Sequence, residues 1–381
     1  MRTLTRNDLY DYLIGSAILS CGHSEDSPNI LALVENIVEK GLKIRLVDPK
    51  DIPDDNMICT ASFQGGGGVP MEVRDLLAPY QTMIESTDPT EMLKKAVTEL
   101  SNHIKEEFYS FMCICTSPFQ CTFPMYLSAL EEKPFIDGDC CGRARPGVYL
   151  SLTNVAKIPL TPMVIVTPLG ETLILKERAP DLPRTGDLIK FIHMASGGRS
   201  TAIASSPASI VDYRRGMIPY QVSRCIDIGN AIRNARKRGG DPVQAFMEKS
   251  SALKIFCGEI KSVEREERLG YSWGEWLIKG SGEFEGHNLR VWWKNENMIS
   301  WLDDKPYVTC PDLICIVDNK DCKGLGLFPQ NIGKKVTVFG LPAHDLWRTG
   351  DGIELWSPRR YKFDIEYESL ESRVKTRLMN N

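Results

Sequence analysis

The sequence predicts an α/β fold with a mostly parallel sheet, followed by a β-rich C-terminal part. Segments with helical periodicity alternate with short apolar segments up to about residue 165, as in parallel βαβ units. From about residue 252 the segments keep a strand period and are separated by turn signals such as Gly350-Asp351-Gly352. The length of 381 residues also exceeds one ordinary domain. We therefore expect an α/β domain over 1–165 and a second domain over 166–381.

In the first half, apolar residues spaced three or four apart predict the helices. The predicted helices span residues 8–20, 29–40, 90–108 and about 123–131. Asn7 or Asp8 is the expected cap of the first helix, and Asp88-Pro89 starts the third. Short apolar or alternating segments predict strands over 42–47, 57–61, 111–115 and 135–136.

The second half begins with paired strands and ends in a run of strand-period segments. Residues 159–166 and 172–175 flank the Leu169-Gly170 turn, and helices are expected over 188–196 and 221–237. Six further strands are expected near 255–264, 272–279, 289–294, 307–317, 335–339 and 353–356.

Composition excludes several classes of protein. Apolar residues make up 42% and charged residues 25% of the chain, with a net charge of -4 and no basic block, so nucleic acid is not an expected partner. No apolar run reaches the ~18 residues that span a bilayer, and no signal peptide is recognised at the start. Several of the 12 cysteines lie in apolar strands, which favours reduced thiols in a cytoplasmic protein.

The loop from Pro134 to Pro146 is the leading candidate for a site. Asp137 and Asp139 are followed by two cysteines and by Arg143, directly after an apolar strand. In α/β proteins ligands are held by the loops at the carboxyl ends of strands. The alternative, weighted equally on spacing alone, is a turn in which Asp139 caps backbone amides and Arg143 forms a salt bridge.

A run of four glycines, Gly65, Gly66, Gly67 and Gly68, stands between a strand and a predicted helix near Glu72. Bare glycines let backbone amides approach an anionic ligand, and a helix N-terminus favours negative charge. No Gly-Lys-Ser/Thr follows, so the run is not a nucleotide phosphate loop. The alternative is a flexible turn.

Cysteine and histidine raise the question of a metal. Paired CxxC knuckles of a structural zinc site are absent, but a catalytic zinc needs only three ligands from separate loops. Loops after neighbouring strands bring Cys115, Cys121 and Asp139 toward one point, and His23 offers an imidazole. Cys115, Cys121 and His23 are the metal candidates, and buried packing is the alternative for each cysteine.

Glu296 forms an unusual polar cluster between Asn295 and Asn297, next to several tryptophans. In a strand, alternate residues face opposite sides, so part of this cluster is able to reach a ligand. A solvated hairpin tip is the alternative.

Five short segments, in chain order, carry a family resemblance. They are residues 15–22, 137–146, 295–298, 311–314 and 357–361. The loop resembles a D-x-D-x-x-G-R-A-x-P pattern through Asp137, Asp139, Gly142, Arg143, Ala144 and Pro146. Together with segments similar to N-E-N-L, P-D-L-I and G-P-R-A-F, it identifies the sequence as resembling the S-methyl thiohydantoin desulfurase family.

The resemblance implies an α/β domain, a β-rich domain, a mononuclear zinc site and a homo-oligomer. The named activity is hydrolysis of an S-methyl thiohydantoin to the hydantoin with release of methanethiol. It also implies that Arg143 binds a substrate carboxylate or ring carbonyl. The chain departs from the family at 114–120, where members show E-I-G-G-x-N, so that Cys115 replaces a glutamate and Gln120 an asparagine.

The leading hypothesis is a metal-dependent hydrolase or desulfurase acting on a small hydantoin-like heterocycle. Asp137, Asp139, Arg143 and Glu296 are its expected catalytic residues. Ligand contacts are expected from Gly65 to Gly68, Gln120 and Asn295. Two alternatives stay open at this point: a catalytically degenerate member that binds a ligand or partner, and a lyase or cyclisation enzyme that uses the same pocket.

Overall fold

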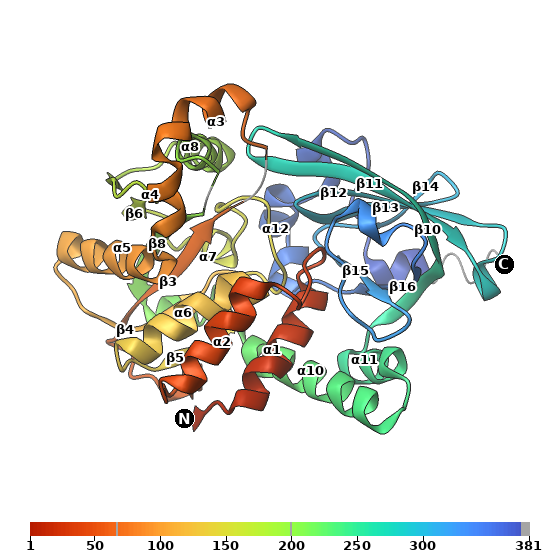
Figure 1. The fold of residues 1–381 in the computed structure, drawn as a ribbon, viewed down its shortest axis with the longest axis horizontal. Coiled ribbons are helices and arrows are strands. Elements are labelled where there is room, and N and C mark those ends of the chain that lie inside the picture. Colours follow the sequence, from red (N-terminus) through yellow and green to blue (C-terminus); the bar gives the residue numbers. More distant parts are fainter. Residues whose placement is uncertain (66–67, 199, 375–381) are drawn as a thin grey trace.

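The computed structural model describes residues 1–65, 68–198 and 200–374, which form two β-sheets with helices packed mainly around the first (Figure 1). The first sheet has nine strands and the second, entirely antiparallel sheet has seven. This confirms the predicted α/β class with a β-rich C-terminal part. No helix among these described residues is long and apolar enough to cross a membrane.

The first sheet has the order β1-β2-β5-β4-β3-β8-β6-β7, with β9 paired to β5. Its centre, β2-β5-β4-β3, is parallel, and the pairings of β1, β7, β8 and β9 are antiparallel. The strands are β1 (Arg2–Thr3), β2 (Arg45–Val47), β3 (Met57–Gln64), β4 (Phe108–Cys113), β5 (Phe135–Asp139), β6 (Met163–Val166), β7 (Thr172–Leu175), β8 (Thr201–Ser209) and β9 (Ile218–Pro219).

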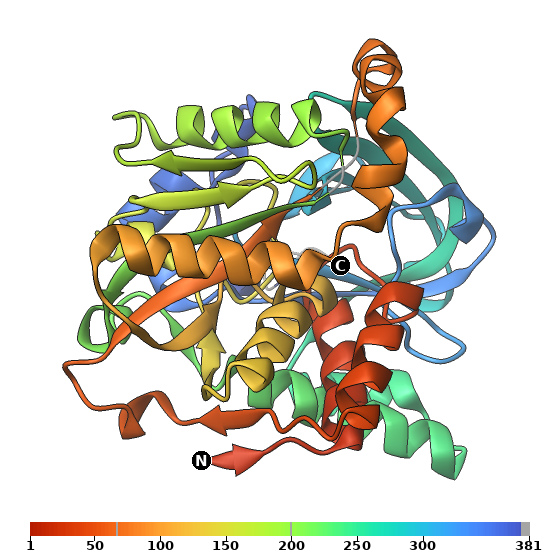
Figure 2. The same cartoon turned by 60° about the vertical axis from the view of Figure 1, so that its left-hand side comes forward.

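Helices cover the first sheet and extend past it toward the second (Figure 2). In that view α5 (orange) and α6 (yellow) lie along the sheet; α5 contacts β6 and β8, and α6 contacts β3 and β4. The helices are α1 (Arg6–Leu19), α2 (Pro28–Glu39), α3 (Met71–Leu77), α4 (Gln81–Ser86), α5 (Pro89–Ile104), α6 (Pro118–Leu130), α7 (Leu152–Val155), α8 (Leu182–Ala195), α9 (Ile210–Tyr213), α10 (Gln221–Arg238), α11 (Pro242–Ser250) and α12 (Gly350–Leu355).

Two glycines allow α1 and α10 to cross at backbone contact. A Cβ atom on Gly15 would lie 2.1 Å from the carbonyl oxygen of Cys225, and one on Gly229 would lie 1.8 Å from that of Asp11. The buried Asp11 carboxylate pairs with Arg233 at 2.5 Å across the same crossing. Because α1 leads directly into the loop that carries His23, this crossing fixes where that loop begins.

The second sheet has the order β14-β13-β12-β11-β10-β16-β15 and encloses its own aromatic core. Trp276 and Trp293 are fully buried there, with ring centroids 5.2 Å apart. The strands are β10 (Leu253–Arg268), β11 (Tyr271–Gly280), β12 (Asn288–Lys294), β13 (Glu296–Leu302), β14 (Lys305–Thr309), β15 (Leu313–Asp318) and β16 (Lys335–Leu341).

Several predicted boundaries were wrong for identifiable reasons. The cap of α1 is Thr5, which forms a capping box with Asp8. Helix α6 begins at Pro118 because Ser117 caps it, and Pro124 lies inside the helix instead of in its first turn. A strand was expected over 353–356, but these residues belong to α12 up to Leu355. The helix starts at Gly350 because the Thr349 hydroxyl caps it by accepting a hydrogen bond from the Gly352 amide.

The segment expected as one strand over 307–317 is two strands, β14 and β15, separated by residues 310–312. The boundary expected between residues 165 and 166 stays a prediction. It falls inside β6, and the pairing of β6 with β8 carries the first sheet past it.

Candidate functional site

A cavity of about 800 Å³ lies between the two sheets, at the carboxyl ends of the central parallel strands. Gly65 follows β3, Cys115 follows β4, and Arg145 lies in the loop after β5. The opposite wall is formed by the α1–α2 loop, by Asn295 and Glu296, and by the chain after β15. This is the edge of an α/β sheet where ligands are generally bound.

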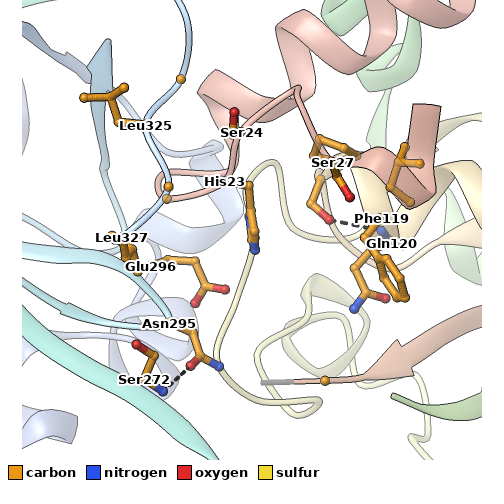
Figure 3. A pocket seen from close by; sticks show the side chains of 18 of the residues that line it. His23, Ser24, Ser27, Phe119, Gln120, Ser272, Asn295, Glu296, Leu325 and Leu327 are labelled. Carbon is orange, nitrogen blue, oxygen red and sulfur yellow. Dashed lines mark hydrogen bonds between the residues drawn. The ribbon is translucent and has the colours of Figure 1, made fainter. Parts of the chain in front are cut away.

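His23 reaches this cavity from the loop after α1 (Figure 3). The loop runs close beneath the second sheet, because the amide of Asn297 donates to the carbonyl oxygen of Cys21 at 2.8 Å. A Cβ on Gly22, whose φ is +152°, would lie 3.3 Å from the carbonyl oxygen of Asn295. Burial lowers the pKa of His23 to about 4, and its Nδ1 atom has no hydrogen-bond partner among the described residues.

Glu296, the first residue of β13, enters the cavity from the second sheet. The preceding Asn295 adopts a left-handed conformation, with φ of 62°, and its side-chain oxygen accepts a hydrogen bond from the Ser272 amide at 2.8 Å. Burial raises the pKa of Glu296 to about 8, although the charges of Arg143 and Lys190 oppose the shift. Its Oε2 atom also lacks a partner among the described residues.

His23 and Glu296 therefore bring a base and an acid from the two parts of the chain to one cavity. In Figure 3 the Glu296 carboxyl group and the His23 ring are directed into the same space. At neutral pH the imidazole is a free base and the carboxyl group holds its proton, since their pKa values lie near 4 and 8. Two groups whose environments push their pKa values apart are the usual arrangement for proton transfer in both directions.

Cys115 lies on the cavity wall as a neutral thiol. Burial raises its pKa well above the ordinary value. A free thiol needs the opposite shift to act as a nucleophile at neutral pH. Its carbonyl oxygen accepts a hydrogen bond from the Cys113 thiol at 2.9 Å, which holds the chain where it leaves β4.

Gln120 also lines the cavity, but both ends of its amide are bound to the backbone. Its oxygen accepts from the Phe63 amide at 2.9 Å, and its nitrogen donates to the Phe63 carbonyl at 2.8 Å. Phe63 and Phe119 stack edge to face at 5.2 Å and form an apolar part of the wall. Gln120 thus fixes the end of β3, and its contact with a ligand stays a prediction.

The glycine run is only partly within the described residues, since Gly66 and Gly67 lie outside them. Gly65 lines the cavity, and its carbonyl oxygen accepts from the Lys190 ammonium at 2.6 Å. Gly68 does not line the cavity; its φ is +76°, its amide donates to Glu267 at 2.8 Å, and it packs against the β10–β11 turn.

The two aspartates of the predicted site lie behind the cavity. The Asp137 carboxylate accepts from the amide and the hydroxyl of Ser223, which anchors the start of α10. Asp139 accepts from the amides of Cys141 and Gly142 and from the Thr116 hydroxyl, and burial raises its pKa to about 6. These bonds shape the loop after β5, as in the turn alternative.

Arg143 is fully buried and joins this loop to the second sheet. It donates to the carbonyl oxygens of Asn297 at 2.5 Å and Asp312 at 2.9 Å, and its guanidinium lies over the Trp356 ring. Arg145, two residues further on, is the arginine of this loop that lines the cavity. The sequence analysis assigned the site role to Arg143 and not to Arg145, although both arginines stand in the same loop.

Comparisons with known proteins agree with this architecture. The sequence model of the S-Me-THD-like N-terminal domain matches residues 7–177, and that of the C-terminal domain matches residues 184–370. The chain belongs to the S-Me-THD-like family. An X-ray crystal structure of a protein from Chromobacterium violaceum is similar to this S-Me-THD-like chain, with a TM-score of 0.76 and 17% identity. The match covers 97% of this chain and 100% of that one, and at this identity it shows the fold alone. No curated protein matches the sequence.

The donor set of this S-Me-THD-like protein does not match a three-residue zinc site. Cys121 points into the core of the first domain, where it shares hydrogen bonds with Cys113 and Tyr12. Within residues 1–65, 68–198 and 200–374, no three or more His, Cys, Asp or Glu side chains are grouped to hold a metal. The remaining positions contain none of these residue types. Of the described donors that line the cavity, Asp26 pairs with Lys323, whereas His23 and Glu296 each have one atom without a hydrogen-bond partner in the described part of the chain.

Proposed function

We propose that this S-Me-THD-like protein is a hydrolase that replaces the methylthio group of a hydantoin-like heterocycle with oxygen and releases methanethiol. The observation that carries the proposal is the pairing of a neutral His23 with a protonated Glu296 on one cavity. Family membership supports the proposed substrate class, and an acid and a base on one cavity support the proposed chemistry.

The first step is the addition of water across the ring C=N bond. A new bond forms between the water oxygen and the carbon that bears sulfur. His23 accepts one proton from the water, and Glu296 gives its proton to the ring nitrogen. This step uses the form of each group that predominates at neutral pH, so neither needs a prior proton transfer.

The second step is collapse of the tetrahedral carbon. The carbon–sulfur bond breaks as the carbonyl forms, and the hydroxyl proton returns to the Glu296 carboxylate. The leaving sulfur takes the proton held by His23 and departs as methanethiol. One water is consumed, the hydantoin and the thiol are released, and both side chains regain their starting protonation.

The cavity suits a small heterocycle in size and in character. Its volume of about 800 Å³ is within the range of small-molecule sites. Phe63 and Phe119 contribute apolar surface to its wall, and Glu296 and Arg145 contribute polar groups. Such a wall excludes bulk water and strengthens the electrostatic effect of the polar groups.

A thiol-release assay on a set of S-methyl thiohydantoins tests the proposal. We expect turnover by the wild type and a loss of about 100-fold or more in both Glu296→Gln and His23→Gln, the range of general acid–base catalysis. Glu285→Gln and His103→Gln are matched controls outside the cavity and should keep the wild-type rate. Full activity in both cavity variants would refute the acid–base assignment.

Absence of thiol release by the wild type would refute the desulfurase activity itself. Binding of a hydantoin without thiol release would then favour the non-catalytic alternative. Conversion of the same heterocycle without loss of the methylthio group would favour the lyase or cyclisation alternative.

A further inference from the structure

We infer that Arg145 is the anion-binding residue of the cavity, and that the substrate is a hydantoin-like heterocycle carrying a carboxylate. The inference rests on the proposed function for the heterocycle, and on the cavity alone for the carboxylate. Carboxylate recognition was expected from Arg143, but that side chain is fully buried and bound to backbone carbonyls.

Arg145 differs from the other cations of the cavity in having no acidic partner. Four basic side chains line the cavity: Arg145, Arg265, Lys323 and Lys334. Arg265 pairs with Glu267 at 2.5 Å, Lys323 with Asp26 at 3.0 Å, and Lys334 with Asp318 at 3.3 Å. No ion pair within the described part of the chain includes Arg145, and its Nε atom is buried without a hydrogen-bond partner there.

The loop after β5 holds Arg145 in place before a ligand arrives. Asp139 fixes the start of the loop through the amides of Cys141 and Gly142. Arg143 then ties it to the second sheet, and Arg145 itself donates to the carbonyl oxygen of Gly147. A guanidinium positioned in advance loses less conformational entropy when it binds, which favours a planar, bidentate carboxylate.

The cavity lacks the negative charge needed to balance Arg145. Glu296 is the acidic side chain beside the reacting space, and at neutral pH it holds its proton. Burial raises the pKa of Glu296, and the positive charge of Arg145 opposes this rise. The charge of Arg145 is therefore felt at the Glu296 carboxyl group. A cation in a desolvated site without a partner is a strong determinant for an anionic ligand.

The carboxylate would also tune the acid. Once a ligand carboxylate neutralises Arg145, the pKa of Glu296 should rise further, because an opposing charge is removed. The anionic substrate would thereby help to keep protonated the group that delivers its proton. A neutral substrate would lack this effect, so its rate should decline at a lower pH than that of an anionic substrate.

Direct binding separates this inference from the proposed function. Titration calorimetry would compare hydantoin-5-acetic acid with its neutral amide, both of which resemble the reaction product. We expect the wild type to prefer the acid by about 10-fold or more, as for a hydrogen-bonded charge pair. Arg145→Gln should lose this preference, and Arg145→Lys should retain part of it.

Arg178→Gln is the matched control, since Arg178 also donates to backbone carbonyls but lies outside the cavity. Its preference for the acid should equal that of the wild type. Equal binding of acid and amide by the wild type, or an unchanged preference in Arg145→Gln, would overturn the inference. A preference for the acid without any thiol release would support Arg145 while refuting the desulfurase activity.

Discussion

Arg143, in the loop after β5, donates a hydrogen bond to the carbonyl oxygen of Asn297 in β13 at 2.5 Å. The side chain of Asn297 in turn accepts from the Trp276 indole at 3.1 Å and donates to the carbonyl oxygen of Ile314 at 3.0 Å. This buried network joins the two sheets directly beside Glu296. Its role is to place the acid of the cavity opposite the loop that carries Arg145.

Removing the Arg143 guanidinium should destabilise the fold and misplace Glu296. Arg143→Met keeps most of the volume but leaves buried carbonyl groups without donors, at about 1–3 kcal/mol for each group. We expect a loss of about 3 kcal/mol in the free energy of unfolding, measured by urea denaturation. Arg178→Met, on the surface, should change it by less than about 0.5 kcal/mol. Equal stabilities would show that the network contributes little.

The rate of thiol release should follow a bell-shaped dependence on pH. In kcat/KM the acidic limb should lie near the pKa of His23, about 4, since the base must be unprotonated. The alkaline limb should lie near the pKa of Glu296, about 8, since the acid must hold its proton. A rate that rises through pH 8 would mean that the ionised carboxylate is the active form, contrary to the assigned role.

Glu296→Gln should lose activity and gain stability, with a gain that depends on pH. The pKa of Glu296 rises from 4.5 to about 8 on folding, so between these values the folded state binds the proton more tightly than the unfolded state. Stability from this group is present at low pH and is lost as pH rises through 8. Gln cannot ionise, so its advantage over Glu should grow by up to about 1.4 kcal/mol per pH unit.

Urea denaturation at about pH 5 and about pH 8.5 would measure this difference. Glu285→Gln, on the surface, should show no such trend. A constant difference between wild type and Glu296→Gln across this range would contradict a raised pKa. The result would then also remove the basis for assigning Glu296 as the proton donor.

Gly229→Ala should separate α1 from α10 and destabilise the protein. The added methyl group would meet the carbonyl oxygen of Asp11 at 1.8 Å, and neither backbone can move without shifting a helix. Overpacking of this kind costs about 1–3 kcal/mol. Gly350→Ala is the control, because a Cβ there has no atom within 4 Å. Thermal unfolding of both variants would test the expectation, which fails if their midpoints agree.

The sequence was sufficient for the architecture because periodicity reflects burial on a single element. Alternating helices and apolar strands predicted the first sheet, and strand-period segments predicted the second. The errors fall where local chemistry decides, as at Ser117, which starts α6 earlier than the apolar pattern suggests. Long-range contacts had no local signal, so the pairing of β8 with β3 and β6 was not anticipated.

The sequence identified a loop that reaches the cavity, but not which of its side chains line it. The loop after β5 does lead to the cavity, but Asp139 and Arg143 turn inward to shape it, and Arg145 reaches the cavity wall. Spacing in a loop does not reveal which of two arginines is buried. Glu296 was expected to be catalytic and His23 to bind a metal. Only the fold brings the two to one cavity, because 273 positions separate them in the chain.

The zinc content of the protein is still to be measured, and the side chains available as ligands favour less than one zinc ion per chain. Family resemblance predicts one zinc ion per chain. His23, Asp26, Cys115 and Glu296 line the cavity, but no three such side chains are grouped to hold a metal among the described residues, and Cys121 is directed into the core. A catalytic zinc site requires three donors that meet at one point. We therefore expect protein purified without chelator to hold well below one equivalent of zinc, and thiol release to survive dialysis against a chelator.

Elemental analysis of the wild type, His23→Gln, Glu296→Gln and Cys121→Ala would test this. One full equivalent in the wild type and in Cys121→Ala, with loss in the other two variants, would overturn the expectation. It would identify His23 and Glu296 as metal ligands. Other groups, such as water, would then complete the coordination of the metal. The pH profile would then report a metal-bound water, because ligation would hold both side chains in their deprotonated forms.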